Sequence, residues 1–267
     1  MGELNSVKEW ILRRKWAVAL AGMASAAIPL AFMAIFINLM VTRVITSRIE
    51  DESANLAILA ARHVEDKLDA DLAKVGLFAT RPLLIDAVEQ QDSRTVLQHL
   101  KMLLNNSNSI ERVFVTTKEG VEFVSLPENK EVYGKDFSHR DWYKGVSQNW
   151  KHYVSEFYQR TALPPRYLFS LAVPVLKDEK VVGVLVMQPK ENYISAAFEN
   201  INFGGSSLYI VDKNQSLISL SNTATGELAK LSGASFVEKL VRGEGGAEIT
   251  DSPIYKIESL IAYQPIK

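Results

Sequence analysis

The stretch Asp136–Tyr143, DFSHRDWY, brings one guanidinium, one indole and one phenol together within its last four positions. If these positions are helical, Arg140 and Tyr143 share one face, because residues three apart on a helix are neighbours, and Trp142 lies beside them. A cation that can donate two parallel hydrogen bonds, next to two aromatic walls, suits the capture of a small carboxylate. The same stretch can instead be a structural corner, with Trp142 in the core and Arg140 in a salt bridge.

The composition removes several classes of site. The chain has 267 residues and no cysteine, which excludes disulfides, thiolate metal sites and cysteine nucleophiles. Its 30 Lys and Arg residues nearly balance its 31 Asp and Glu residues, so no basic surface for nucleic acid is indicated. The histidines have no metal-ligand spacing, and neither a nucleophile elbow nor a phosphate loop occurs. We therefore expect no metal, no cofactor and no catalysis in this chain.

A long apolar segment near the N-terminus predicts a membrane anchor. Residues 16–42 contain no ionisable side chain, and about 20 apolar residues are enough for a helix to cross a bilayer. Basic residues precede this segment within residues 1–15, which predicts a cytoplasmic N-terminus and places everything after Arg43 outside the cytoplasm. A cleaved signal peptide is the alternative, but its apolar core would be shorter and would end in a small-x-small site.

Residues 43–109 read as a stem helix followed by two short helices. From 44 to about 78 the apolar residues recur in steps of three or four, and the other faces are charged. Such a narrow stripe serves either as a dimer seam or as the face of a helix that packs on a core. Pro82 then opens one short helix, and Asp92 can cap another.

Strand signals dominate the rest of the chain. Runs rich in β-branched and aromatic residues predict strands at 110–116, 121–126, 153–158, 167–176 and 181–188. A helix at 191–200 follows, and after residue 204 the strand–turn–strand pattern restarts in a smaller unit. The predicted fold class is α+β: a transmembrane helix, a long stem helix, and two tandem antiparallel-sheet units at 110–203 and 204–267.

The order of these motifs resembles that of a known family. The RDWY start at 140–143 is followed by the Tyr-rich stretch 153–158 and by two apolar strands, at 170–175 and 182–185. With the stem before them, these motifs are similar to those of the double Cache (dCache) extracytoplasmic sensing domain. That domain belongs to bacterial transmembrane receptors of the chemoreceptor, sensor histidine kinase and diguanylate cyclase types. The resemblance covers nearly everything after Arg43.

The resemblance implies an architecture and a set of partners. It implies a PAS-like membrane-distal unit that binds a small molecule, a PAS-like membrane-proximal unit, and an anchor in the bacterial inner membrane. It also implies a homodimer through the stem helix and no nucleic-acid partner. The chain ends in what reads as the last strands of the proximal unit, so we expect a second membrane helix and the output domain to lie beyond it.

The resemblance also implies which residues bind the ligand. In the amino-acid-binding branch of the family, the Arg and Trp at the helix start hold the ligand carboxylate, and two aspartates hold its ammonium. By position, Arg140, Trp142, Tyr143 and Tyr158 carry over to this chain. The two aspartates do not carry over, and their replacements bear on the class of ligand.

Arg160 and Gln188 stand at the two aspartate positions. The loss of two anions and the gain of a cation remove the attraction for an ammonium group and favour a second carboxylate. We therefore expect the pocket to prefer a small organic acid, such as a dicarboxylate, over an α-amino acid. The alternative is that Arg160 points to solvent and the pocket binds an uncharged molecule or nothing. Phe169 is also expected to line the pocket, and Lys135 and Arg166 are nearby cations without an assigned direction.

These observations predict the ligand-sensing part of a membrane receptor, in which the stem helix passes a conformational signal across the bilayer. Two other functions stay open. One is a membrane-anchored periplasmic hydrolase, and the other is a dimerisation module with a vestigial pocket. Ligands separate the three, because a sensor is stabilised by a ligand that remains unchanged, an enzyme consumes it, and a vestigial module does not respond.

Overall fold

The computed structural model describes residues 2–160, 167–201, 203, 206–219, 229–231 and 233–266. The chain divides into two compact units, residues 1–54 and residues 55–267, and each is considered by itself.

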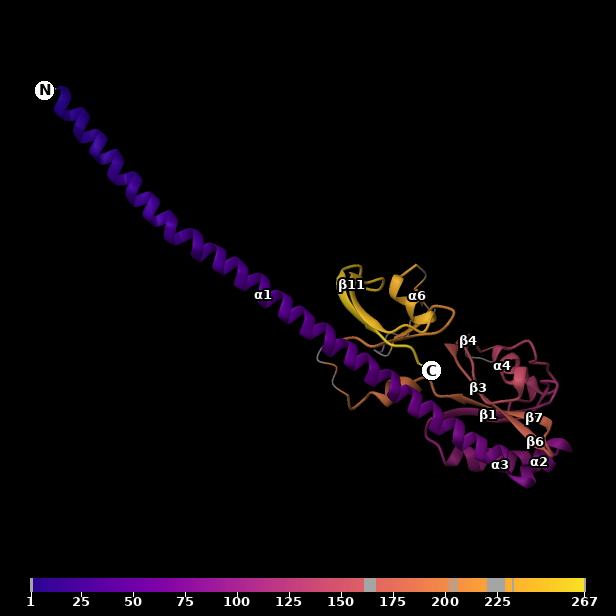
Figure 1. Cartoon of the computed structure of the whole chain (residues 1–267). Coiled ribbons are helices and arrows are strands. Elements are labelled where there is room, and N and C mark those ends of the chain that lie inside the picture. The colour runs from indigo at the N-terminus through magenta and orange to yellow at the C-terminus, as the bar shows by residue number, and fades with distance from the viewer. Residues whose placement is uncertain are drawn as a thin grey trace. The chain divides into compact units, whose positions relative to one another are not determined.

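The first unit lies within helix α1, which runs without a break from Gly2 to Ala79 and has Pro29 inside it. Within Ala27–Ala79 one 18-residue window has a mean hydropathy of 2.0, and none of that window is buried. By length and composition, this helix is able to cross a membrane. Figure 1 shows α1 in indigo and purple, from the N-terminus onward.

The second unit is built on one antiparallel five-stranded sheet. Its strand order is β2-β1-β7-β6-β3. In that order the strands are Glu122–Leu126, Ile110–Thr117, Lys180–Pro189, Leu171–Lys177 and Tyr153–Val154. The two hairpins β1–β2 and β6–β7 join where β7 pairs with β1, so the centre of the sheet is formed by strands far apart in the sequence.

Alternate side chains of the sheet enter two different cores, as the two-residue period of a strand requires. On one face Val113 and Val115 pack with Leu185 and Met187 against α1, α2 and α3. On the other face Phe114, Val186 and Ala172 pack against α4. Helices α2, α3 and α4 span Pro82–Glu89, Ser93–Asn105 and Asp141–Asn149. Figure 1 shows the sheet between α2 and α3 on one side and α4 on the other.

Two helix starts agree with their sequence signals. Pro82 is the first residue of α2, where its missing N–H costs nothing. The Asp92 carboxylate accepts hydrogen bonds from the N–H groups of Arg94 and Thr95, at 3.1 and 3.3 Å, and so caps α3. From Ala60 onward the stem part of α1 packs on the core of its own unit, which is one of the two roles expected for its apolar stripe.

Two of the expected strands are broken. The stretch 153–158 gives β3 and a separate β4, Tyr158–Gln159, and the stretch 167–176 gives β5, Tyr167–Leu168, before β6. Between the pieces, the Ser155 N–H donates to the Ser170 carbonyl and the Ser170 N–H donates to the Ser155 hydroxyl, both at 2.9 Å. A side chain thus replaces part of the backbone ladder. The helix expected at 191–200 is shorter, since α5 spans Tyr193–Ala197.

The remaining elements form small sheets. Strands β10, β9 and β8 form a three-stranded sheet in that order, and β11 pairs with β12. The bounds of these elements are Tyr209–Val211 (β8), Ser216–Ser219 (β9), Ala229–Lys230 (β10), Ser235–Val241 (α6), Gly246–Asp251 (β11) and Glu258–Tyr263 (β12). Phe236 and Val237 of α6 and Tyr263 of β12 share a core. The antiparallel sheets with separate helices confirm the predicted α+β class.

Gly183 provides a test of how closely β7 approaches its neighbours. A Cβ at this position would lie 2.5 Å from the Thr116 carbonyl oxygen and 2.6 Å from a Val88 methyl carbon. We expect Gly183→Ala to lower the free energy of unfolding by about 1–3 kcal/mol, because the core must shift to make room. Gly76→Ala in α1 is the matched control. A Cβ added there would meet no atom within 4 Å apart from the neighbouring backbone of its own helix, so this variant is expected to gain about 0.5–1 kcal/mol. Urea unfolding measures both, and equal effects would contradict the prediction.

Candidate functional site

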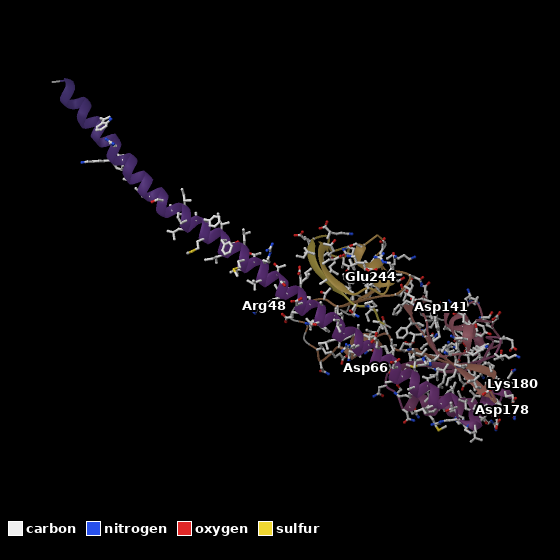
Figure 2. The ribbon with its side chains drawn as sticks, in the orientation of Figure 1. Arg48, Asp66, Asp141, Asp178, Lys180 and Glu244 are labelled. Carbon is white, nitrogen blue, oxygen red and sulfur yellow. The ribbon has the colours of Figure 1, made fainter. Side chains whose placement is uncertain are left out.

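The RDWY motif begins helix α4. Arg140 is the N-cap residue, with φ −74° and ψ 149°, and its N–H donates to the Phe137 carbonyl at 2.9 Å. Asp141, labelled in Figure 2, is the first helical residue, and its carboxylate accepts from the Glu156 N–H at 2.8 Å and from the Tyr153 hydroxyl at 3.3 Å. These bonds anchor the start of α4 to the segment that follows β3, and they fix where the Arg140 side chain begins.

The aromatic residues of the motif have structural partners. Trp142 is 1% exposed, and its ring stacks edge-to-face with Phe114 at 5.5 Å and with Tyr143 at 5.9 Å. The Tyr143 hydroxyl donates to the Lys118 carbonyl in the turn between β1 and β2. Trp142 is therefore part of the core between α4 and the sheet. This agrees with the alternative that the stretch is a structural corner, as far as Trp142 is concerned.

Tyr158 connects the helix to the sheet. Its hydroxyl accepts a hydrogen bond from the Gln188 amide at 2.9 Å and lies 2.6 Å from the Ser170 hydroxyl. The Arg140 guanidinium lies over the Tyr158 ring, 5.4 Å from its centroid. Burial raises the pKa of Tyr158, while its hydrogen bonds and the charges of Arg140 and Arg112 lower it. The structure thus brings Arg140, Tyr158 and Gln188 together, and two guanidinium groups act on one phenol.

Arg112 of β1 is a further candidate site residue, which the sequence interpretation missed. It stands opposite Gln188 in the pairing of β1 with β7, and its guanidinium lies 4.7 Å from the centroid of the Phe114 ring. It forms an ion pair with Glu122 of β2, and the two side chains are 11% and 1% exposed. The two-residue period of the strand places Arg112 on the same face as Phe114, and this was the signal available in the sequence.

Glu122 is a buried acid with an unusual environment. Burial raises its pKa to about 7, although the Arg112 charge and hydrogen bonds from Ser125 and Arg112 oppose the shift. Among the residues that the structure describes, Glu122 Oε2 has no hydrogen-bond partner, and neither has Gln188 Oε1. Buried polar atoms without a partner are uncommon, and they point to a missing donor.

Glu122 is expected to make the stability of the protein depend on pH. Its pKa rises from an ordinary value of 4.5 to about 7 on folding, so its favourable contribution is fully present below pH 4.5. That contribution to the free energy of unfolding is lost as the pH rises through 7, by about 3 kcal/mol, because folding must then bury a charge. Urea unfolding at low and high pH measures the change. Glu122→Gln cannot ionise and is expected to remove this part of the pH dependence, whereas an unchanged dependence would contradict the assignment.

Arg160 does not point to solvent, which was the alternative considered for it. Its Nη1 lies 2.6 Å from Oε1 of Glu111, and the Arg160 side chain is only 12% exposed. It is therefore paired on the protein rather than directed into solvent. Lys135 is exposed, and Arg166 lies outside the described residues.

Phe169 is not brought to the site. Its ring packs against Phe157 at 5.3 Å and Tyr193 at 5.6 Å, in the core on the opposite face of the sheet. Alternation along the chain explains this placement, because the next residue, Ser170, is the one that reaches Tyr158. The expectation that Phe169 lines the pocket therefore has no support in the geometry.

Strand β7, which contains Gln188, is followed by helix α5, and α5 contacts the stem part of α1. Strand β7 ends at Pro189 and α5 begins at Tyr193, whose hydroxyl donates to Asp71 Oδ2 at 2.8 Å. Asp71 is 5% exposed and also forms ion pairs with Lys67 and Lys74, at 3.8 and 3.2 Å. A short connection therefore links the site to the buried carboxylate Asp71 and its two lysine partners on this helix.

Metal-binding geometry is not found in the part of the chain that the structure describes. No group of three or more His, Cys, Asp or Glu side chains gathers there in a way that could hold an ion.

The family comparison agrees with this fold. A model of the Cache domain, of the dCache type, matches residues 41–267, and the chain belongs to this family. The predicted resemblance is thereby confirmed. The chain contains a sensor domain of signal-transduction proteins, and such domains are non-enzymatic ligand-binding modules. One apolar N-terminal helix followed by a domain of this kind fits a single-pass membrane receptor.

Solved structures show the same fold at low sequence identity. The ligand-binding domain of the Pseudomonas aeruginosa PAO1 amino acid chemoreceptor PctB, in complex with L-Arg, is 15% identical. The match covers 83% of this chain and 90% of that one, with a TM-score of 0.62. The extracellular domain of rpHK1S-Z16, described as a histidine kinase, is 19% identical, with 83% and 90% covered and a TM-score of 0.64.

A third structure is longer than this chain. The extracellular ligand binding receptor from Desulfohalobium retbaense DSM5692 is 12% identical over 74% of this chain, with a TM-score of 0.55. The match spans 36% of that receptor's chain. No curated protein matches this chain. At such identities the structural likeness establishes the fold, and the ligand must be argued from the residues of this site.

Proposed function

We propose that this chain is the extracytoplasmic ligand-sensing part of a bacterial transmembrane receptor, and that its membrane-distal unit, 110–203, binds a small organic acid. The observation that carries the proposal is the position of Arg140, at the start of α4 and over the ring of Tyr158. A guanidinium at this place can hold a ligand carboxylate with two parallel hydrogen bonds, and the buried Trp142 behind it keeps the helix start rigid.

The charges around the site favour an acid over an amino acid. Both Arg140 and Arg112 act on Tyr158, whereas Arg160, two residues further along the chain, is paired with Glu111. An ammonium group would meet these cations, whereas a carboxylate is attracted to them. An α-amino acid is the second candidate, because PctB is described as an amino acid chemoreceptor and because the buried oxygens of Gln188 and Glu122 can accept hydrogen bonds from an ammonium group.

The direction of the signal follows from the anchor and the connection behind Gln188. The basic residues within 1–15 favour a cytoplasmic N-terminus in the inner membrane, with the smaller proximal unit, 204–267, nearer the bilayer. Ligand binding that shifts the end of β7 would move Tyr193 against Asp71 and so displace the stem within a homodimer.

Ligand titration tests this function. The full chain in lipid nanodiscs is titrated by calorimetry with small mono- and dicarboxylates, with α-amino acids and with the methyl esters of the acids. We expect acids to bind and their esters not to bind, and a saturating acid at 100 times its Kd to stabilise the protein by about 2.7 kcal/mol.

Each other outcome identifies a different function. Binding of α-amino acids alone would support the sensor function but refute the organic-acid ligand class. Consumption of an added compound would support the hydrolase alternative. A chain that responds to none of these compounds would be the dimerisation module with a vestigial pocket.

A further inference from the structure

We propose that Arg112 is a second ligand-binding cation, and that the ligand is a small dicarboxylate whose second carboxylate replaces Glu122 at the Arg112 guanidinium while Glu122 takes up one proton from solvent. This inference rests on the proposed function and deepens it from an organic acid to a dicarboxylate with proton-coupled binding. No covalent bond of the ligand changes, and the only transfer is one proton from water to the Glu122 carboxylate.

The position of Arg112 links it to the first cation. Arg112 and Gln188 stand opposite each other on β1 and β7, and the Gln188 amide donates to the Tyr158 hydroxyl. The Arg140 guanidinium lies over the Tyr158 ring. The two guanidinium groups therefore flank the Tyr158–Gln188 pair, with Arg140 over the phenol ring and Arg112 as the residue that pairs with Gln188. Two cations on either side of one hydrogen-bonded pair match a molecule that carries two anionic groups.

Glu122, the ion-pair partner of Arg112, can be displaced from it in the protonated form. A ligand carboxylate next to an ionised Glu122 would place two anions side by side in a buried site, which is strongly unfavourable. Glu122 is 1% exposed, and burial already raises its pKa to about 7. Protonation near neutral pH therefore costs little, and it leaves the Arg112 charge for the ligand.

The groups that face Glu122 are compatible with the protonated form. Arg112 faces it from β1, and the Ser125 hydroxyl faces it from β2. The Tyr133 hydroxyl, from the segment after β2, lies next to Ser125, since it accepts from the Ser125 N–H at 3.1 Å. Within the described part of the chain, no second carboxylate contributes to the pKa of Glu122. Once protonated, the carboxyl group can donate from Oε2, the atom without a partner among the described residues, to the incoming carboxylate.

Arg160 is a weaker choice for the second cation. Its partner Glu111 has a side chain that is 25% exposed, compared with 1% for Glu122. A more exposed carboxylate experiences less of the desolvation that favours proton uptake. The Arg160–Glu111 pair therefore serves as the internal control for the Arg112–Glu122 pair.

Calorimetry of the full chain in nanodiscs tests the inference. The probes are malonate, succinate, fumarate and L-malate, compared with acetate and propionate, in two buffers of different ionisation enthalpy. We expect at least one dicarboxylate to bind at least tenfold more tightly than both monocarboxylates. At about pH 8 its binding should take up close to one proton, and its affinity should fall about tenfold per pH unit above 7.

Two variants separate the roles of the ion pair. Glu122→Gln keeps the shape of the side chain and is expected to abolish proton uptake and the pH dependence while dicarboxylate binding persists. Arg112→Gln is expected to reduce the dicarboxylate affinity to that of a monocarboxylate. In the control Glu111→Gln, the number of protons taken up on binding should be the same as in the wild type. A general disturbance of the site would change that number.

Three results would overturn the inference. Dicarboxylate binding without proton uptake would remove the role of Glu122, and equal affinity for propionate and succinate would remove the role of Arg112. In both cases the proposed acid sensor would stand. A chain that binds amino acids and none of these acids would refute the inference and the proposed ligand class together.

Discussion

Arg140→Ala is expected to weaken the binding of an acid ligand by about 100-fold, because removal of one partner of a buried charge pair typically costs 2–5 kcal/mol. The guanidinium has a defined position over Tyr158, so no other cation can take its place without moving the start of α4. Arg140→Lys keeps the charge but loses the two-pronged geometry, and we expect about a tenfold loss. Calorimetric titration with the best acid ligand measures both effects.

Lys135→Ala is the matched control for Arg140. Lys135 is also a cation of the segment before α4, but it is exposed, and its removal should change the affinity less than twofold. Thermal unfolding of the Arg140 variants without ligand is measured in parallel, to separate lost binding from lost folding. If Arg140→Ala binds the acid as tightly as the wild type, the ligand site lies elsewhere in the chain.

Trp142→Ala is expected to cost the most stability, about 3–5 kcal/mol, because a side chain that is 1% exposed leaves a large cavity in the core under α4. Its edge-to-face contacts with Phe114 and Tyr143 are lost as well. Urea unfolding followed by circular dichroism measures the effect.

The control for Trp142 is Leu83→Ala at the start of α2. Leu83 is 69% exposed, so its truncation should change the free energy of unfolding by about 0.5 kcal/mol or less. A loss below about 1 kcal/mol in Trp142→Ala would mean that the indole is not a core group, and that the motif serves the ligand alone.

Much of the fold follows from local signals in the sequence. Pro82 and Asp92 mark helix starts by rules that involve neighbouring residues only, and the β-branched and aromatic residues of 110–116 predict the strand that the structure has at Ile110–Thr117. The break between β3 and β4 could not be predicted in this way. It depends on Ser155 meeting Ser170, and that meeting exists only after the sheet has formed.

The candidate site residues differ in the same way: those with a local sequence signal were predicted, and those that depend on contacts between strands were missed. Arg140 and Tyr158 belong to a recognisable motif, and Gln188 was located by counting along it. The ion pair of Arg112 with Glu122 joins two strands and exists only after β1 and β2 have paired, so it reads in the sequence as two ordinary strand charges. Phe169 lies in the core on the other face of the sheet, and its neighbour Ser170 is the residue that reaches Tyr158.

The bond between Tyr193 and Asp71 has a consequence for building hybrid receptors. Both residues lie outside 110–189, the span that contains Arg112, Arg140, Tyr158 and Gln188. Exchanging that span between relatives would therefore change the recognised molecule and leave the joint with the stem helix intact. Exchanging the longer span 110–197 would also replace Tyr193, the hydrogen-bond partner of Asp71. Asp71 is only 5% exposed, and a buried carboxylate that loses its hydrogen bond destabilises the protein.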